Sequence, residues 1–152
     1  MKALVQRVEK VTLFTKQDTI KFIGEIEKGL LVFVGIEKQD TLEDLHYLAD
    51  KVVNLRVFED DQGKLNISVK DKNYEIMCIP NFTLSACVRK GRRPSFDNAA
   101  SKDKASQFFD IFYKKLKEFQ IRCVVGIFGA SMVIEARNYG PVNIILDSAD
   151  RK

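Results

Sequence analysis

Hydrophobic and polar positions in the first 36 residues predict three β-strands. The segment MKALVQRVEKVTLF (1–14) alternates between apolar and polar side chains, as a strand does when one face is buried. A polar stretch, TKQDT, separates it from a second strand, IKFIGEI (20–26). After a short EKG turn, LLVFVGI (30–36) is continuously apolar, which is typical of a central strand. Two such short connections favour an antiparallel meander.

The pattern then changes to the period of a helix. Asp40 or Thr41 can cap a helix over about 42–53, because either side chain can accept hydrogen bonds from the first turn. Glu43 or Asp44 supplies the acidic residue of a capping box. We therefore expect an amphipathic helix.

The rest of the chain alternates between strand patterns and one more helix. Strand character returns in 55–69, around an Asp-Gln-Gly turn, and in YEIMCIPNF (74–82). A long polar and basic connection (85–100) leads to a second helix over about 102–119, with apolar residues on one face. The segments IRCVVGIFG, SMVIEAR and PVNIILD supply three closing strands. The pattern predicts a single α+β domain with a mostly antiparallel sheet and two helices.

Composition narrows the class of protein. A chain of 152 residues with 45% hydrophobic composition is long enough for one domain with a sizeable core. The start of the chain lacks the pattern of a signal peptide, and no apolar stretch approaches the length of a membrane span, about 18 residues. The three cysteines, Cys78, Cys87 and Cys123, form no C-x-x-C pair, so neither a disulfide framework nor a zinc site is predicted. We expect a cytoplasmic protein.

The apolar run that ends in IPNFTLSA (79–86) is interrupted by Pro80, which cannot donate a ladder hydrogen bond. Asn81, Thr83 and Ser85 follow it. A hydroxyl-bearing strand end is most often structural. The functional interpretation is an oxyanion hole, in which N–H groups freed by the broken ladder face developing negative charge.

The loop VRKGRRPSF gathers four cations within five positions: Arg89, Lys90, Arg92 and Arg93. On composition alone it is as readily a solvated loop as a binding site. The functional interpretation is contact with nucleic-acid phosphates, which positions a backbone without reading its sequence. Lysines of the second helix could extend the same field. The net charge of +4 adds little to this argument.

Two further features bear on chemistry. Gly140-Pro141 precedes an apolar strand, where such a pair most often forms a turn. In a cis arrangement its two carbonyl groups would point the same way and could hold an ammonium group. His46, the single histidine, falls inside the first predicted helix, where a surface position is the usual role. A catalytic triad is therefore disfavoured, because it needs a histidine held beside its nucleophile.

Taken in order, these segments resemble the D-aminoacyl-tRNA deacylases, once called D-tyrosyl-tRNA deacylases. The resemblance covers residues 1–148 and leaves 149–152 as a short C-terminal tail. It is carried by LVQRV at the start, the long run from KGLLVFVG to KLNISV, NFTL, RKGRRPSF, GIFGASM and NYGPVNIILDS. KGRRPSF and the opening segment are its most specific parts.

The resemblance implies a homodimer of compact, β-barrel-like subunits, with active sites at the subunit interface. It implies a cofactor-free and metal-free hydrolase that cleaves the ester between a D-amino acid and the 3′-terminal adenosine of tRNA. Glycine mischarged on tRNA-Ala would be a further substrate. The reaction is chiral proofreading in translation. Aminoacyl-tRNA is the implied partner, with no membrane involved and the basic loop as its RNA contact.

The resemblance also assigns site residues. A cis Gly140-Pro141 pair from one subunit would enter the partner's site, hold the amino group and leave no room for an L-side chain. Arg7 matches an arginine that steadies this pair. A Ser-Gln-Phe-Thr motif lines the other wall and is matched by Pro80-Asn81-Phe82-Thr83. Backbone N–H groups near Phe82 and Thr83 would stabilise the oxyanion, and the RNA 2′-hydroxyl would assist.

Within that motif we favour a water-positioning role for Thr83 over a nucleophilic one, because no base stands ready to activate its hydroxyl.

The sequence departs from the family pattern at two motifs. Pro80-Asn81 replaces Ser-Gln, and Asn143 replaces the threonine of Gly-Pro-Val-Thr. A proline at the first position resembles related deacylases that remove L-alanine and have a trans Gly-Pro pair. Two alternatives therefore stay open: a relaxed or L-alanine-directed deacylase, and a catalytically inactive nucleic-acid-binding homologue. A trans Gly140-Pro141 bond would favour the L-alanine-directed enzyme.

Overall fold

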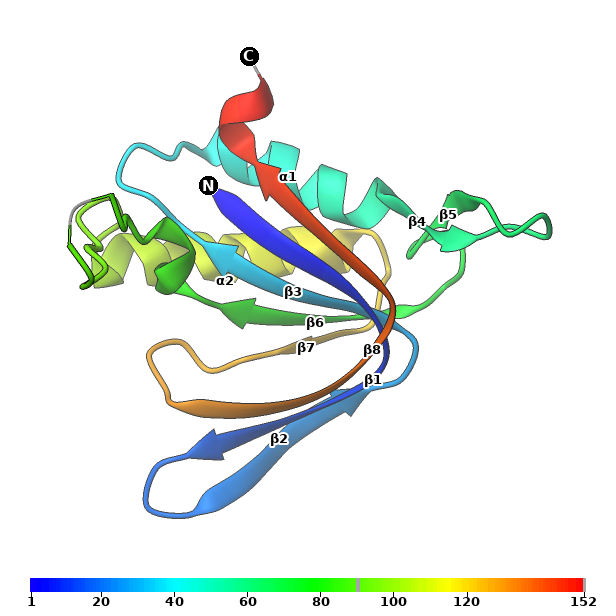
Figure 1. The fold of residues 1–152 in the computed structure, drawn as a ribbon, viewed down its shortest axis with the longest axis horizontal. Coiled ribbons are helices and arrows are strands. Elements are labelled where there is room, and N and C mark those ends of the chain that lie inside the picture. The colour runs from blue at the N-terminus through cyan, green and yellow to red at the C-terminus, as the bar shows by residue number, and fades with distance from the viewer. Residues whose placement is uncertain (90, 152) are drawn as a thin grey trace.

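The computed structural model describes residues 1–89 and 91–151 (Figure 1). Within these ranges the chain forms two α-helices, eight strands and two short 3-10 helices. The elements are β1 (Lys2–Lys16), β2 (Ile20–Ile26), β3 (Gly29–Gly35), α1 (Leu42–Asn54), β4 (Arg56–Glu59), β5 (Leu65–Ser68), β6 (Glu75–Pro80), η1 (Phe82–Ser85), α2 (Lys102–Glu118), β7 (Cys123–Val125), β8 (Met132–Asp147) and η2 (Ser148–Arg151).

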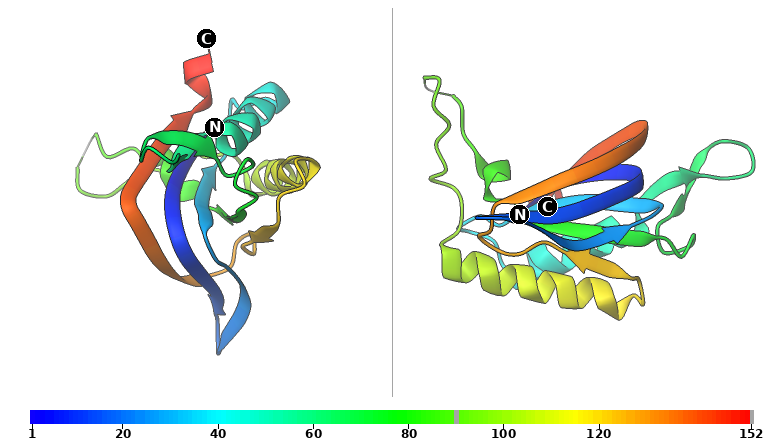
Figure 2. Two further views of the ribbon diagram at one scale, coloured as in Figure 1. Left: turned by 90° about the vertical axis from the view of Figure 1, so that its right-hand side faces the viewer. Right: turned by 90° about the horizontal axis from the view of Figure 1, so that it is seen from below.

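The main sheet has six strands in the order β2-β1-β3-β6-β7, with β8 on the other edge of β1. The first half of β1 pairs with β3 and its second half with β2, while β8 runs along nearly its whole length. The sheet curls so strongly that its ends approach each other (Figure 2). A Cβ on Gly24 of β2 would lie 2.8 Å from a methyl carbon of Val124 in β7. The sheet is therefore a nearly closed barrel.

The expected α+β class with a barrel-like sheet and two helices is confirmed, and the pairing adds detail. All pairs of β1 are antiparallel, but β3–β6 and β6–β7 are parallel, because helices and loops carry the chain back between them. The predicted meander is wrong, since β2 and β3 share one edge of β1 and do not pair with each other. The last two predicted strands form one continuous strand, β8.

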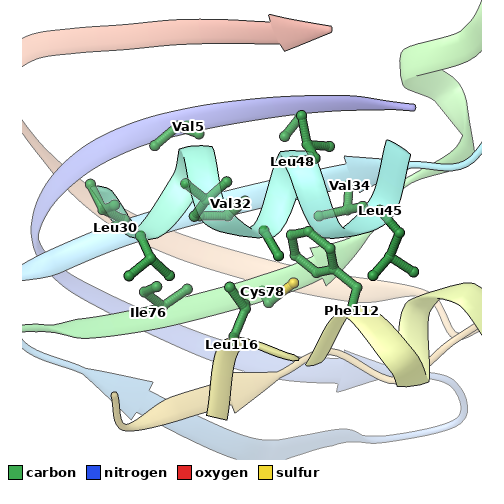
Figure 3. Close-up of a cluster of buried hydrophobic side chains, with 14 of the residues drawn as sticks. Val5, Leu30, Val32, Val34, Leu45, Leu48, Ile76, Cys78, Phe112 and Leu116 are labelled. Carbon is green, nitrogen blue, oxygen red and sulfur yellow. The ribbon is translucent and has the colours of Figure 1, made fainter. Parts of the chain in front are cut away.

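Alternate residues of the central strands point into two separate apolar layers. Val32 of β3 and Cys78 of β6 face the helices, where they pack with Phe112 and Leu116 of α2 (Figure 3). Leu31 of β3, with its β6 neighbours, faces the interior of the barrel. The continuous apolar pattern of β3 thus reflects burial on both faces. This packing fixes where the ends of β3 and β6 lie.

Local capping sets where the helices begin. Thr41 is the N-cap of α1 and forms a reciprocal capping box with Asp44. Burial raises the pKa of Asp44, but hydrogen bonds from Thr41 and the charge of Arg151 outweigh this effect and lower it. Ser101 caps α2 by accepting from the backbone N–H of Lys104, at 3.4 Å. Both boundaries agree closely with those that the sequence predicts.

Three peripheral features concern the single histidine, the C-terminal residues and the length of the helices. His46 is exposed on α1, as expected. Residues 149–151 of the expected C-terminal tail belong to η2, in which Arg151 forms ion pairs with Glu43 and Asp44, and Lys152 lies outside the described residues. Over residues 1–89 and 91–151, no helix combines the length and apolarity needed to cross a membrane.

Candidate active site at the ends of β3 and β6

The interrupted strand of the sequence ends at Pro80, the last residue of β6. Pro80 lies opposite Val34 in the parallel β3–β6 ladder, and the next N–H, that of Asn81, donates to the carbonyl oxygen of Val34 at 2.8 Å. Beyond this bond the chain turns into η1. The proline therefore stands where the ladder stops, which is a position that proline tolerates.

Asn81 organises the start of η1. Its side-chain oxygen accepts a hydrogen bond from the backbone N–H of Thr83 at 3.1 Å and from the Thr83 hydroxyl at 2.5 Å. Phe82, between them, is 58% exposed and packs edge-on against Phe96, with ring centroids 5.0 Å apart. The shortened side chain of Asn81, compared with glutamine, is thus used locally, and it fixes the orientation of the Thr83 hydroxyl.

A cavity of about 380 Å³ opens beside this turn, between the ends of β3 and β6, η1 and the beginning of α2. Its volume falls in the range typical of small-molecule sites, about 300–1,000 Å³. The lining is mostly apolar and includes Pro80, Phe82, Ala100 and Phe128, with Asn81 as a polar group. Lys102 is the one charged residue among the described residues that line it.

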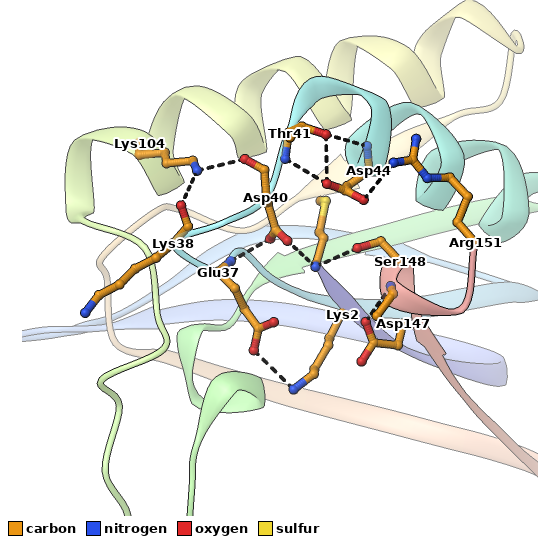
Figure 4. Close-up of polar contacts among 12 residues, drawn as sticks. Lys2, Glu37, Lys38, Asp40, Thr41, Asp44, Lys104, Asp147, Ser148 and Arg151 are labelled. Carbon is orange, nitrogen blue, oxygen red and sulfur yellow. Dashed lines mark hydrogen bonds and ion pairs between the residues drawn. The ribbon is translucent and has the colours of Figure 1, made fainter.

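A polar network holds the wall opposite η1 in place (Figure 4). The ammonium group of Lys104 donates to the carbonyl oxygens of Lys38 and Asp40, at 2.6 and 2.8 Å. The Asp40 carboxylate accepts from the backbone N–H of Glu37 at 2.6 Å and also pairs with the amino group of Met1. These bonds tie the β3–α1 loop to the first turn of α2. The ammonium group of Lys104, one of the lysines of the second helix, is used in this link.

The floor under η1 is tightly packed. A Cβ on Gly35 would lie 2.9 Å from the Leu84 Cβ and 3.1 Å from the carbonyl oxygen of Asn81. Ser85, which the sequence placed in the same motif, is buried, and its hydroxyl has no hydrogen-bond partner among the described residues. The close approach at Gly35 means that η1 can sit in this position only above a residue without a side chain.

Gly140 and Pro141 lie in the middle of β8, where the strand bulges. Gln6 pairs with Asn143 and Val8 with Asn138, so residues 139–142 face a single residue of β1, Arg7. The Gly140–Pro141 peptide bond is cis, the isomer that the resemblance implies for the D-directed enzymes. Gly140 has a φ of +124°, a conformation that L-residues rarely adopt. The pair is exposed at the surface of the chain.

Arg7 fills the space under this bulge and is only 5% exposed. Its Nε donates to the carbonyl oxygen of Tyr139 at 3.1 Å, and its terminal nitrogen donates to that of Val57 at 2.9 Å. The guanidinium also lies 4.5 Å from the centre of the Tyr139 ring and 3.6 Å from the Glu59 carboxylate. A Cβ on Gly140 would come within 2.9 Å of the guanidinium. Arg7 is therefore packed directly against the Gly-Pro bulge.

The structure brings the predicted site residues together in two groups. Pro80, Asn81 and Phe82 line the cavity, and Thr83 follows them in η1 as an exposed residue, while Arg7 and the Gly-Pro pair lie on the β1–β8 edge and do not line it. Asn143, the second departure from the family pattern, accepts a hydrogen bond from the Gln6 side chain at 2.9 Å. Within one chain, the two groups do not form a single site.

Arg89, Arg92 and Arg93 are exposed on the segment between η1 and α2 (Figure 2). Paired backbone hydrogen bonds between Cys87 and Ser95, at 2.8 and 2.9 Å, close the base of this loop. Lys90, the fourth predicted cation, lies outside the described residues. Among the described residues none forms an ion pair with these three guanidinium groups, so they can meet a ligand from solvent.

The pattern alone did not single out two of the residues that line the cavity. Phe128 is contributed by the turn after β7, and Lys102 by the first turn of α2. GIFGASM contains Phe128 and supported the family resemblance, but no role followed from it. No cluster of three or more metal-ligating residues occurs within the described part of the chain.

Comparison with known proteins finds relatives over nearly the whole chain. The family model for D-Tyr-tRNA(Tyr) deacylase matches residues 4–147. Proteins named D-aminoacyl-tRNA deacylase from Clostridium perfringens and Thermotoga petrophila are 49% and 46% identical over 148 and 149 residues, which cover 97% and 98% of both chains in each comparison.

Two solved structures share the fold. The c-Myc DNA Unwinding Element Binding Protein has a TM-score of 0.89 at 40% identity, and the alignment covers 97% of this chain and 98% of the other. A probable eukaryotic D-amino acid tRNA deacylase has a TM-score of 0.82 at 16% identity, covering 95% and 97%, which bears on the fold alone. The chain belongs to the D-Tyr-tRNA(Tyr) deacylase family.

Proposed function

We propose that this protein hydrolyses the ester bond of D-aminoacyl-tRNA and glycyl-tRNA mischarged on tRNA-Ala, releasing the amino acid and free tRNA as a proofreading step in translation. The observation that carries the proposal is the near full-length match to relatives named D-aminoacyl-tRNA deacylase, with Asn81 and Phe82 lining a cavity of ligand size and Thr83 bonded to Asn81 beside it. Translation supplies such esters in the cytoplasm, where we expect the protein to act.

The chemistry we propose is orientation of an already reactive ester. An aminoacyl ester beside a vicinal hydroxyl needs little activation once a water molecule is aligned with it. Asn81 occupies the N–H of Thr83, which leaves the N–H of Phe82 as the donor for the developing oxyanion. The 2′-hydroxyl of the RNA would take part in the proton transfers.

For Thr83 we propose a water-positioning role. Its hydroxyl donates its proton to the amide oxygen of Asn81, which cannot act as a base. The lone pairs of the hydroxyl remain available to accept a hydrogen bond from water. A nucleophilic threonine would instead need a basic partner at this position.

For selectivity we propose that the Gly-Pro bulge enters the cavity of a second copy of the chain. Gly140 and Pro141 are exposed and separate from their own cavity, as such an exchange requires. Arg7 would hold the bulge in shape through its bonds to Tyr139 and Val57. The bulge would then bind the amino group of the substrate and exclude L-side chains.

We further propose that Arg89, Lys90, Arg92 and Arg93 bind the tRNA backbone. Single-stranded or duplex phosphates would be held without base readout, so binding should weaken as salt rises. Neutralising the three described arginines together should raise KM more than it lowers kcat. Neutralising an exposed lysine of another element, such as Lys51 of α1, should change neither.

Hydrolysis of D-tyrosyl-tRNA and L-tyrosyl-tRNA under the same conditions tests the main proposal. We expect release of D-tyrosine and little release of L-tyrosine, with the first abolished by Thr83→Ala and unaffected by Thr19→Ala, a hydroxyl removed from an exposed turn. Equal inertness toward both esters would contradict the proposal. Faster turnover of L-alanyl-tRNA would instead identify the L-alanine-directed enzyme.

A mixing experiment tests the exchange between two copies. Gly140→Ala should disable the bulge, and Thr83→Ala should disable the cavity, so each homodimer should be inactive. Because half of randomly mixed dimers contain one copy of each and hold one intact site in two, the mixture should regain about a quarter of wild-type activity. A mixture as inactive as its parts would refute a shared site.

A second candidate function is nucleic-acid binding without catalysis. The observation in its favour is the name of the relative with 40% identity, a DNA-element-binding protein, together with the exposed arginine loop. Binding of uncharged tRNA or DNA without hydrolysis of any aminoacyl ester would support it. Hydrolysis that depends on Thr83 would exclude it.

A further inference from the structure

Lys102 has an unusual place in the fold. It is exposed, begins α2 and lines the cavity opposite η1. Its side chain runs toward the turn after β7, since its Cε would lie 3.9 Å from a Cβ on Gly129. The cation therefore sits at the rim of a cavity whose other walls are mostly apolar.

The charge of Lys102 has no evident structural use. A cation in the first turn opposes the helix dipole, whose positive end lies there. Within residues 1–89 and 91–151, no carboxylate forms an ion pair with it. Two other lysines of the same helix differ: Lys104 links two loop carbonyls, and Lys115 pairs with Glu118. A lysine whose charge the fold leaves unused, at the rim of a cavity, is suited to an anionic ligand.

The rest of the cavity limits what that anion is attached to. Phe82 and Phe128, both lining residues, offer aromatic surface, and Pro80 and Ala100 add apolar contacts. A ligand that fills this space needs a flat, weakly polar body and one anionic group at its edge. A nucleotide has both, because its base stacks on aromatic side chains and its phosphate carries the charge.

We infer that Lys102 binds the 5′-phosphate of the terminal nucleotide of the substrate, and so positions the ester at η1. The inference rests on the proposed function and extends it to a residue outside the motifs. Lysine suits this task because its ammonium group is a compact charge on a flexible stem, which can follow a phosphate without fixed geometry. Lys102 is a positioning residue, since it contacts the substrate away from the reacting bond.

Two minimal substrates isolate the phosphate. D-tyrosyl esters of adenosine and of 5′-AMP differ only in the group that Lys102 is expected to bind. Lys102→Ala should lower kcat/KM for the AMP ester by about threefold to tenfold, mostly through KM, and leave the adenosine ester unchanged. Lys102→Arg should restore the AMP ester. Lys51→Ala, at an exposed position of α1, should affect neither.

The tRNA substrate gives a second readout. The salt dependence of log KM should become shallower by about 0.7 in Lys102→Ala, as expected when one phosphate contact to single-stranded RNA is lost. An equal loss with both minimal esters, or no loss with the AMP ester, would overturn the inference. Either result would mean that Lys102 acts on the fold or not at all.

Failure of the proposed function can be distinguished from failure of the inference about Lys102. A wild-type protein that hydrolyses none of the esters refutes that function, and binding then decides the role of Lys102. In titrations followed by NMR, 5′-AMP should bind the wild type more tightly than adenosine does, and Lys102→Ala should remove the difference. Identical binding of 5′-AMP by wild type and variant overturns the inference.

Discussion

Replacing Arg7 by lysine tests how the Gly-Pro bulge is held. Arg7 donates to two carbonyl oxygens, those of Tyr139 and Val57, and stacks on the Tyr139 ring. Lysine keeps the charge but has a single nitrogen, so it can retain one carbonyl contact and loses the flat stack. The variant therefore removes specific contacts while the site stays charged.

The loss can be estimated from these contacts. A hydrogen bond from a charged donor contributes about 1.5–3 kcal/mol, and a partly exposed stack about 0.5–1 kcal/mol. The nearby Glu59 carboxylate is 45% exposed, so its ion pair adds little. The free energy of unfolding should fall by about 2–4 kcal/mol, which in a chain of this length lowers Tm by about 4–16 °C.

Urea unfolding of wild type and Arg7→Lys measures this difference, and hydrogen exchange at Asn138 and Tyr139 should accelerate more than exchange in α1. Arg137→Lys is the matched control, because Arg137 is exposed on β8, the strand that carries the bulge. It should change stability by less than about 0.5 kcal/mol. An Arg7→Lys protein as stable as this control would refute the role given to the guanidinium, and deacylation at wild-type rate would separate the bulge from catalysis.

Three further outcomes are expected. Gly35→Ala should displace η1 and lower deacylation at least tenfold, because the new methyl group meets the backbone of η1. In Gly24→Ala the methyl group meets a side chain of β7, so this control should lower stability but not kcat. Equal activities of the two variants would contradict the expectation. Hydrogen bonds from an asparagine side chain and from backbone N–H groups lower the pKa of Asp60. The stabilisation that Asp60 contributes is therefore complete above the ordinary aspartate pKa of about 3.9, and it should be lost as pH falls through the lower pKa of the folded state. Acid titration of Asp60→Asn should accordingly show a weaker pH dependence below about pH 4, and an unchanged profile would count against it. Burial raises the pKa of Cys123 to about 11, so iodoacetamide at pH 8 should label Cys87 before Cys123. Mass spectrometry measures the order of labelling, and faster labelling of Cys123 would show that its burial is transient.

Features that depend on near neighbours in the chain were predictable from the sequence. The hairpin of β1 and β2, both helices and the capping role of the Thr41 region follow from short-range patterns, and the structure contains them with nearly the expected limits. The end of the strand at Pro80 was also predictable, because proline lacks the backbone N–H that donates to a sheet ladder, whatever its surroundings. Family motifs added Arg7 and the Gly-Pro pair, whose contact no periodicity could suggest.

Long-range pairing was decided only by the tertiary structure. An apolar strand carries no signal for the direction of its partner, so the pattern could not predict that β3 and β6 pair in parallel. Nor could it predict that β8 continues without a break. The cavity depends on these pairings, because they bring Phe128 and Lys102 to the residues of η1 from segments more than 15 positions away along the chain. The sequence by itself determined the local elements and the motif residues, whereas the curl of the sheet decided which of them share a site.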